Sequence, residues 1–228
     1  MRSDPSPMAA LLAGFGSRAS AVDEAAHRVV RPFDHAVPAP VDLDEAISGR
    51  RGELLDALLR RQSSLRYADD PVRAELVFPL LQGALRRDSA EWGLDDSDAL
   101  EAFVFVLRSE GSAPGVYRVT ARECAFVAPV SAIGDIEDLV VQRELATAAG
   151  IVSVCGRLDH AGAHGYRLRV TRAAMAIYDF HLRAQSRDLA GTLFAGFIAS
   201  AARNLLHSDG VTRHPLISAT YGRPVPVG

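Results

Sequence analysis

The sequence predicts an α+β protein in which helices surround a small sheet. Two short apolar runs, 103–107 and 151–155, have the length and composition of buried strands. At 111–115 the sequence Gly-Ser-Ala-Pro-Gly predicts a turn that joins two strand-like segments into a hairpin. Leucines at helical spacing, within 54–59 and 76–85, predict amphipathic helices. Helices outnumber strands in this prediction.

The amino-terminal part divides into an extension and the start of a domain. Residues 1–40 are rich in Pro and Ala, and they predict an extension with one or two short helices that crosses the surface or a partner subunit. Residues 41–228 are then one domain. Asp42 can cap a helix that the leucines of 54–59 continue. A polar break at 62–71 separates that helix from the one through Leu85.

The remaining elements alternate between short strands and helices. Strands are expected at 103–107, 116–119, 124–127, 151–155, 192–197 and 216–221. Asp135 is expected to cap a helix that runs to Gly150. The longest helix is expected at 171–189, with His181 and Gln185 on one side, and a shorter helix at 199–206. Cys155 is expected to be a small core residue.

Composition excludes several classes of function. The chain has 228 residues, 48% hydrophobic and 23% charged, which is ordinary for a globular protein. Its formal net charge of −3 gives no basic excess for sequence-independent binding of nucleic acid. The sequence contains no lysine, so all 25 basic residues are arginines. A lysine Schiff base, a P-loop and a protein-kinase site are therefore excluded.

The sequence also argues against a membrane, a secretory route and a metal. No run approaches the ~20 apolar residues of a membrane span, and the start of the chain lacks the features of a signal peptide. Two cysteines are too few for a disulfide framework, so we expect a cytoplasmic protein. Of seven histidines only His160 and His164 have a useful spacing, and the glycines at 162 and 165 argue against a helix there. No metal site is expected.

The most informative stretch is the basic segment 60–67. Forked arginine donors alternate with hydroxyls at the end of a predicted helix, an arrangement that suits a phosphate. The alternative is a solvated, arginine-rich helix end that interacts with its own dipole. Composition alone favours that alternative.

Four motifs in order resemble the FMN-dependent nitroreductase family. Segment 61–67 (Arg-Gln-Ser-Ser-Leu-Arg-Tyr) resembles the opening R-x-S motif of that family. Segment 113–118 resembles the hairpin of its SagB-type, azoline-oxidising branch, and 164–167 with the following helix resembles that branch's "RgYR". Segment 216–224, which ends Tyr-Gly-Arg-Pro, resembles the family's closing strand. The resemblance covers roughly residues 50–225.

The resemblance implies a fold, a cofactor and partners. The fold would be a central antiparallel sheet wrapped by helices, in an intertwined homodimer with two FMN sites at the interface. Arg61, Gln62 and Ser63 would hold the FMN phosphate and ribityl chain, with Arg66 and Arg223 as further contacts. The substrate would be a small molecule or a peptide, with other biosynthetic enzymes as further partners and no nucleic acid.

The departures from the family pattern leave two functions open. The azoline oxidases carry a catalytic Lys-Tyr pair where this chain has His160 and Ala161. His160 titrates near neutral pH and can serve as the base in an FMN-dependent azoline dehydrogenation, with Tyr166 as the next candidate for proton transfer. The alternative is a degenerate relative that binds a peptide or a partner enzyme without redox activity.

Overall fold

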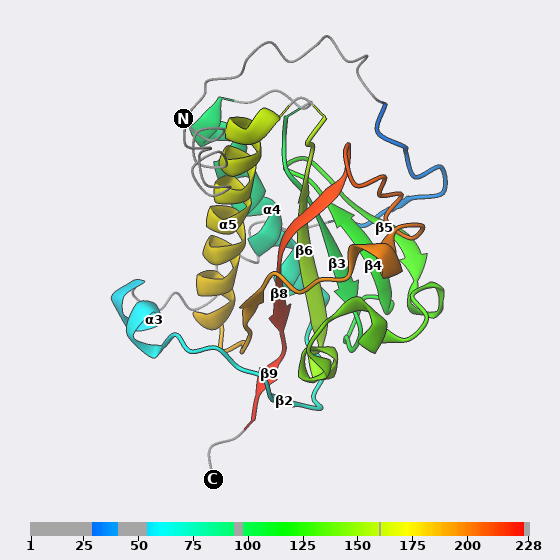
Figure 1. The fold of residues 1–228 in the computed structure, drawn as a ribbon. Helices are drawn as coiled ribbons and strands as arrows, with labels where there is room; N and C mark the ends of the chain where they lie inside the picture. The colour runs from blue at the N-terminus through cyan, green and yellow to red at the C-terminus, as the bar shows by residue number, and fades with distance from the viewer. Residues whose placement is uncertain (1–28, 41–53, 94–97, 160, 226–228) are drawn as a thin grey trace, which may run out of the picture.

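The computed structural model describes residues 29–40, 54–93, 98–159 and 161–225, whose fold is drawn in Figure 1. At its centre is a seven-stranded sheet with the strand order β1-β5-β4-β3-β6-β8-β7. The pairings between its neighbouring strands are antiparallel. The strands are β1 (Val37–Pro38), β3 (Glu101–Val106), β4 (Gly115–Val119), β5 (Cys124–Pro129), β6 (Gly150–Gly156), β7 (Leu193–Phe194) and β8 (His214–Tyr221).

Helices cover both faces of the sheet. α4 (Ala74–Trp92) and α5 (Gly162–Gln185) pack side by side on one face (Figure 1). On the other face lie α6 (Ala199–Ala202) and short 3₁₀ helices, and α3 (Leu54–Arg60) projects from the body. The 3₁₀ helices span Val130–Ala132, Ile136–Leu139 and Arg143–Thr147. The predicted α+β class with a central antiparallel sheet is confirmed.

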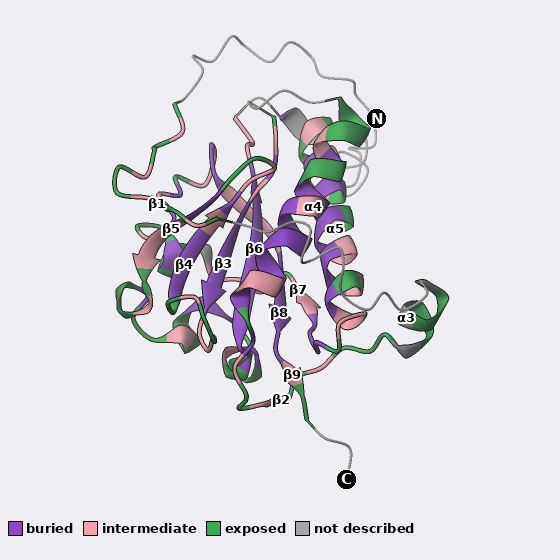
Figure 2. Ribbon diagram, turned by 180° about the vertical axis from the view of Figure 1, so that it is seen from behind, coloured by how far each residue is buried: buried purple, intermediate pink, exposed green. Residues whose placement is uncertain are grey.

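Strand β3 shows how the apolar runs separate two cores. Ala102, Val104 and Val106 pack into the core beneath α4 and α5, whereas Phe103 and Phe105 pack into the core on the opposite face. The strand is therefore apolar at every position and not only at alternate ones. In Figure 2 the central strands β3, β4 and β6 are coloured almost entirely as buried, as is much of α4 and α5.

The described residues before α3, 29–40, pack against the β5 edge of the sheet in the same chain. β1 pairs with β5, and the Phe33 ring stacks on the imidazole of His207 with 4.5 Å between centroids. The Arg213 guanidinium lies 4.9 Å from the centroid of the Phe33 ring, a favourable cation–π geometry. The expected domain boundary at residue 40 stays a prediction.

Most predicted elements form, but three predictions are wrong. The helix expected to run from Asp135 to Gly150 is two separate 3₁₀ helices, although Asp135 does cap the first by accepting from the Glu137 amide at 2.9 Å. The longest helix begins at Gly162, nine residues before the expected start. The sheet has one strand more than expected, because β1 pairs with its β5 edge, and the strand expected at 192–197 is only the two-residue β7.

Helix α3 forms where the leucines predicted it, and the expected cap at Asp42 lies outside the described residues. Three of its leucines are exposed. Leu55, Leu58 and Leu59 are 63%, 43% and 76% exposed. Exposed leucines on a projecting helix are typical of a surface that meets another chain. Among the described helices, none is long and apolar enough to cross a membrane.

Candidate functional site

The basic segment 61–67 connects α3 to the short strand β2 (Tyr67–Ala68) and runs beside the carboxyl end of α5. The Gln185 side chain donates from Nε2 to the Gln62 carbonyl at 2.9 Å. The Ser64 amide donates to the Gly191 carbonyl at 3.0 Å. Two backbone positions of the segment are thereby fixed, one by α5 and one by the chain leading into β7.

The end of the chain returns to the same place. Strand β9 (Arg223–Pro224) pairs with β2 in antiparallel register, with Arg223 opposite Ala68. The opening and closing motifs of the sequence, more than 150 residues apart, therefore lie side by side at one end of the sheet (Figure 1). The pairing places Arg223 beside Ala68, and that Arg61 and Arg223 bind one phosphate stays a prediction.

The predicted cofactor-binding side chains are accessible. Arg61, Gln62, Ser63 and Arg66 are exposed, and Arg223 is half-buried. Within the described part of the chain, no carboxylate forms a salt bridge with Arg61 or Arg66. Exposed guanidiniums beside a hydroxyl on a fixed backbone fit the phosphate end of a flavin nucleotide.

Arg223 has a more acidic setting than Arg61. It lines an open cavity of about 440 Å³ together with Asp70, Glu110 and Asp188. Three acidic residues therefore line the same cavity as Arg223. Arg223 is therefore a weaker candidate for a phosphate ligand than Arg61, because an incoming anion would also meet negative charge.

A buried hydroxyl network supports the segment from below. The Tyr67 hydroxyl donates to the Ser64 carbonyl at 2.5 Å and lies 2.5 Å from the Thr220 hydroxyl of β8. Thr220 in turn accepts from the Thr192 amide at 3.0 Å. Burial raises the pKa of Tyr67 to about 12, against the opposing effect of the Thr220 hydrogen bond. Tyr67 is therefore a neutral donor at physiological pH.

His181 lies on α5 next to Gln185, the residue that bonds segment 61–67. It is buried on α5, and its Nε2 lies 3.2 Å from Nε2 of Gln185. Burial, and secondly the charge of Arg61, lower the pKa of His181 to about 4. The imidazole is neutral under physiological conditions, and its ring closes the space behind Gly191, where an added Cβ would lie 3.4 Å from Nδ1.

The predicted catalytic residues lie elsewhere. Tyr166 is in the first turns of α5 and is 44% exposed, so it is not part of the core. His160 is outside the described residues. At about 1.5 Å per residue, Tyr166 and Gln185 are about 28 Å apart along α5. One chain therefore does not bring Tyr166 together with segment 61–67.

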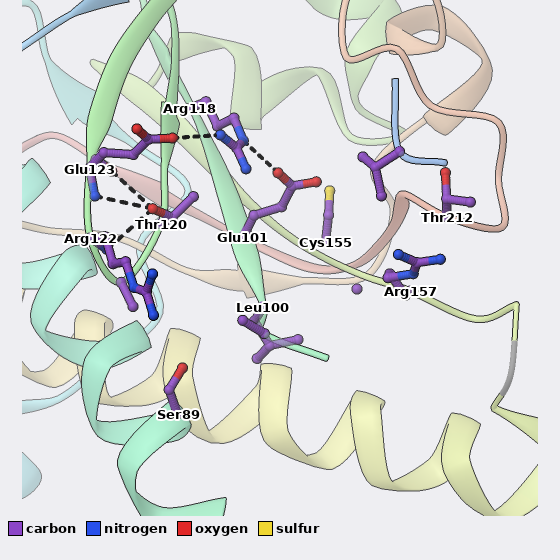
Figure 3. Close-up of a pocket in the computed structure, with 14 residues that line it drawn as sticks. Ser89, Leu100, Glu101, Arg118, Thr120, Arg122, Glu123, Cys155, Arg157 and Thr212 are labelled. Atoms are coloured by element: carbon purple, nitrogen blue, oxygen red, sulfur yellow. Dashed lines mark hydrogen bonds and ion pairs between the residues drawn. The ribbon is translucent and has the colours of Figure 1, made fainter. Parts of the chain in front are cut away.

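A second cavity, of about 540 Å³, lies near the amino-terminal half of α5 (Figure 3). It is lined by residues of β3, β4 and β6 together with Ser89 near the end of α4. Glu101 accepts from Arg118 at 2.6 Å and also pairs with Arg213, while Arg118 bonds Glu123 at 2.8 Å. Three arginines (Arg118, Arg122 and Arg157) and two glutamates (Glu101 and Glu123) line this cavity. Arg157, which lines this cavity, is three residues before His160 in the sequence.

Several residues of the site carry no signal in the sequence. Thr220 contacts Tyr67 across 153 residues, and Gly191 is needed because an added Cβ would lie 2.3 Å from the Thr220 carbonyl oxygen. Gln185 and His181 were expected on one side of the helix, but nothing in their spacing indicates that they reach segment 61–67. In the part of the chain that the structure describes, no three His, Cys, Asp or Glu side chains form a group suited to a metal.

Comparisons with known proteins identify the fold. No protein-family model matches the chain, and no curated protein does either. Among solved structures, a protein from Anabaena variabilis that carries the name nitroreductase has a TM-score of 0.63 at 20% identity. The match covers 76% of this chain but only 38% of that one, so this chain spans well under half the length of that protein.

Two further structures match along most of their own length. One is from the E. coli microcin synthetase McbBCD complex with truncated pro-MccB17 bound, with a TM-score of 0.56, 16% identity, and coverage of 92% of this chain and 85% of that one. The other is a Desulfovibrio desulfuricans protein named as a nitroreductase, in complex with FMN, with a TM-score of 0.51, 17% identity, and coverage of 77% and 88%. At these identities the likeness establishes a nitroreductase-like fold.

Proposed function

We propose that the protein is an FMN-dependent oxidoreductase that dehydrogenates a peptide-derived azoline, as in the SagB-type branch. The observation that carries the proposal is segment 61–67, which is tethered at one end of a nitroreductase-like sheet with its two exposed arginines outside any described salt bridge. An FMN-bound protein and a microcin synthetase among the structural neighbours support the cofactor and the substrate class.

The chain's own residues would bind the flavin by its phosphate. Arg61 and Arg66 would provide charged donors and Ser63 a hydroxyl, while Gln62 would contact the phosphate or ribityl chain and Arg223 would be a further phosphate contact. When bound, FMN supplies an acceptor for a hydride. The protein's part is to hold the phosphate, orient the ring and take up a proton.

Oxidation of an azoline to an azole removes one hydride and one proton from the ring. His160 takes the proton, because a histidine is a competent base near neutral pH without a large pKa shift. Tyr166, exposed near the start of α5, is the next candidate for that transfer.

The distance along α5 makes a homodimer part of the proposal. The start of α5 and segment 61–67 can serve one flavin only if different protomers supply them. The exposed leucines of α3 offer an apolar surface for such an interface. In each protomer, residues 41–228 would be the nitroreductase-like domain and residues 1–40 an extension of it. Other biosynthetic enzymes would be further partners. Light scattering should give about twice the 24.4 kDa of one chain.

Arg61→Ala tests the cofactor site. Loss of a charge-assisted contact should weaken FMN binding by about ten- to a hundredfold, measured by quenching of flavin fluorescence. The control is Arg86→Ala, whose guanidinium donates to the Ala121 carbonyl at 2.7 Å at a distance from this site. Equal FMN affinity in Arg61→Ala and wild type contradicts the assignment.

The alternative function is a protein of this fold that binds a peptide or a partner enzyme without redox activity. It is favoured by the absence of the relatives' Lys-Tyr pair at His160 and Ala161. One simple measurement distinguishes the two functions. A purified protein that takes up FMN and turns yellow supports the oxidoreductase, and one that stays colourless with added FMN supports the alternative.

A further inference from the structure

We propose that Gln185 and His181 are a positioning pair that holds segment 61–64 in the shape that grips the flavin phosphate. The inference rests on the proposed function, and it assigns a role to two residues of α5 that do not themselves touch the cofactor. It is carried by a chain of contacts that starts in the buried face of the helix and ends at the backbone between Arg61 and Ser63.

The first link fixes the orientation of the Gln185 amide. The Gln62 carbonyl can only accept a hydrogen bond, so the Gln185 atom that lies 2.9 Å from it must be the nitrogen. That nitrogen has a second hydrogen, and the atom that lies 3.2 Å from it is Nε2 of His181. An amide nitrogen does not accept, so Nε2 of His181 must be the acceptor and carry no proton.

The second link keeps His181 in that state. Burial of the ring and the nearby charge of Arg61 both disfavour the imidazolium. The neutral ring then carries its proton on Nδ1, on the side of Gly191. His181 is thus a fixed acceptor, and it holds the Gln185 amide so that the other N–H points at Gln62.

The third link connects the pair to the phosphate ligands. Gln62 lies between Arg61 and Ser63, and the next residue, Ser64, is tied through its amide to Gly191. Fixing the peptides at 62 and 64 fixes the backbone from which the Arg61 and Ser63 side chains reach. Pre-ordering of this kind lowers the entropy lost when an anion binds, so it contributes to affinity without direct contact.

The test compares FMN with riboflavin, which has the same ring and no phosphate. In Gln185→Leu the affinity for FMN should fall about five- to twentyfold, while the affinity for riboflavin stays within about twofold of wild type. Gln185→Glu keeps the size of the side chain but offers no N–H to Gln62, so it should lose at least as much. Ser186→Ala is the matched control, because its hydroxyl bonds only the Arg183 carbonyl of its own helix.

A second measurement needs no flavin. Hydrogen exchange of peptides that cover 62–66 should be faster in Gln185→Leu than in wild type or Ser186→Ala, since the Ser64 amide loses part of its protection. Unchanged exchange, or an equal loss of FMN and riboflavin affinity, overturns the positioning role while leaving the FMN site intact. A wild-type protein that does not prefer FMN to riboflavin overturns the proposed phosphate site, and this inference with it.

Discussion

Asp88 on α4 and Arg172 on α5 form a two-point ion pair that is closed off from water. Arg172 Nε lies 3.1 Å from one carboxylate oxygen and its Nη2 lies 2.7 Å from the other. Their side chains are 4% and 2% exposed. The pair joins the two helices that cover one face of the sheet, so it fixes how they align.

Asp88→Ala should be strongly destabilising. It leaves the Arg172 guanidinium buried without its counter-charge, and this typically costs about 3–5 kcal/mol in the free energy of unfolding. The double variant Asp88→Leu with Arg172→Met should recover most of that loss, because two apolar side chains of similar size need no pairing. Urea unfolding of both variants checks the prediction. A loss of under about 1 kcal/mol in Asp88→Ala would contradict it.

His181 should make the protein sensitive to mild acid. Its pKa is lowered to about 4 in the folded chain, from 6.5 in an unfolded one, so the unfolded chain binds the proton first as the pH falls. The stability that depends on the neutral ring is complete above about pH 6.5 and is lost as the pH falls through about 4, by at most about 3 kcal/mol.

His181→Phe should flatten this part of the profile. Unfolding free energies measured from pH 7 to pH 4.5 should fall less steeply in the variant than in wild type, while the two curves run parallel above pH 7. Parallel curves over the whole range would show that other groups, and not His181, determine the acid response.

Two glycine substitutions should have opposite signs. In Gly191→Ala the new Cβ would lie 2.3 Å from the Thr220 carbonyl oxygen, so the strand carrying Thr220 must shift, and we expect a loss of about 1–3 kcal/mol. Gly83 is inside α4, where an added Cβ meets only the end of the Arg87 side chain at 3.5 Å. Gly83→Ala should therefore stabilise by about 0.5–1 kcal/mol through helix propensity. Thermal unfolding of both variants checks the pair, and a neutral Gly191→Ala would be contrary to the close contact.

The sequence predicted the elements whose apolar pattern has only one interpretation. The runs at β3 and β6 were read correctly as buried strands, and the turn before β4 as a hairpin. The Asp135 cap was also correct, but the helix that it begins is interrupted. Val140 and Val141 pair with Phe197 and Gly196 from a distant part of the chain, and this contact pulls them out of the helix. No local sequence pattern predicts this long-range contact.

The start of α5 was missed for a related reason. A glycine at 165 argues against a helix in the sequence, but Arg169 lies one turn further on, and its guanidinium occupies the space beside that glycine. From there Arg169 reaches Asp98 at 2.5 Å. The glycine serves packing around an ion pair, which a single sequence does not reveal. The site shows the same limit, since segment 61–67 was found from its motif, whereas Thr220 and Gly191 entered it only through the fold.

The length of α5 has a consequence for mixtures of two impaired variants, assayed at an FMN concentration that saturates wild type and not Arg61→Ala. In the proposed dimer each flavin takes its phosphate contacts from one protomer and its proton acceptor from the other. When Arg61→Ala and His160→Ala protomers are combined, each hybrid dimer has one site with both substitutions and one with neither. Random exchange makes about half of the dimers hybrid, so the mixture should regain about a quarter of wild-type turnover. If a single protomer supplied both groups, each site would keep one defect and mixing would restore nothing. In the proposed dimer, a helix too long for one active site would thus make each subunit able to complement the other's defect.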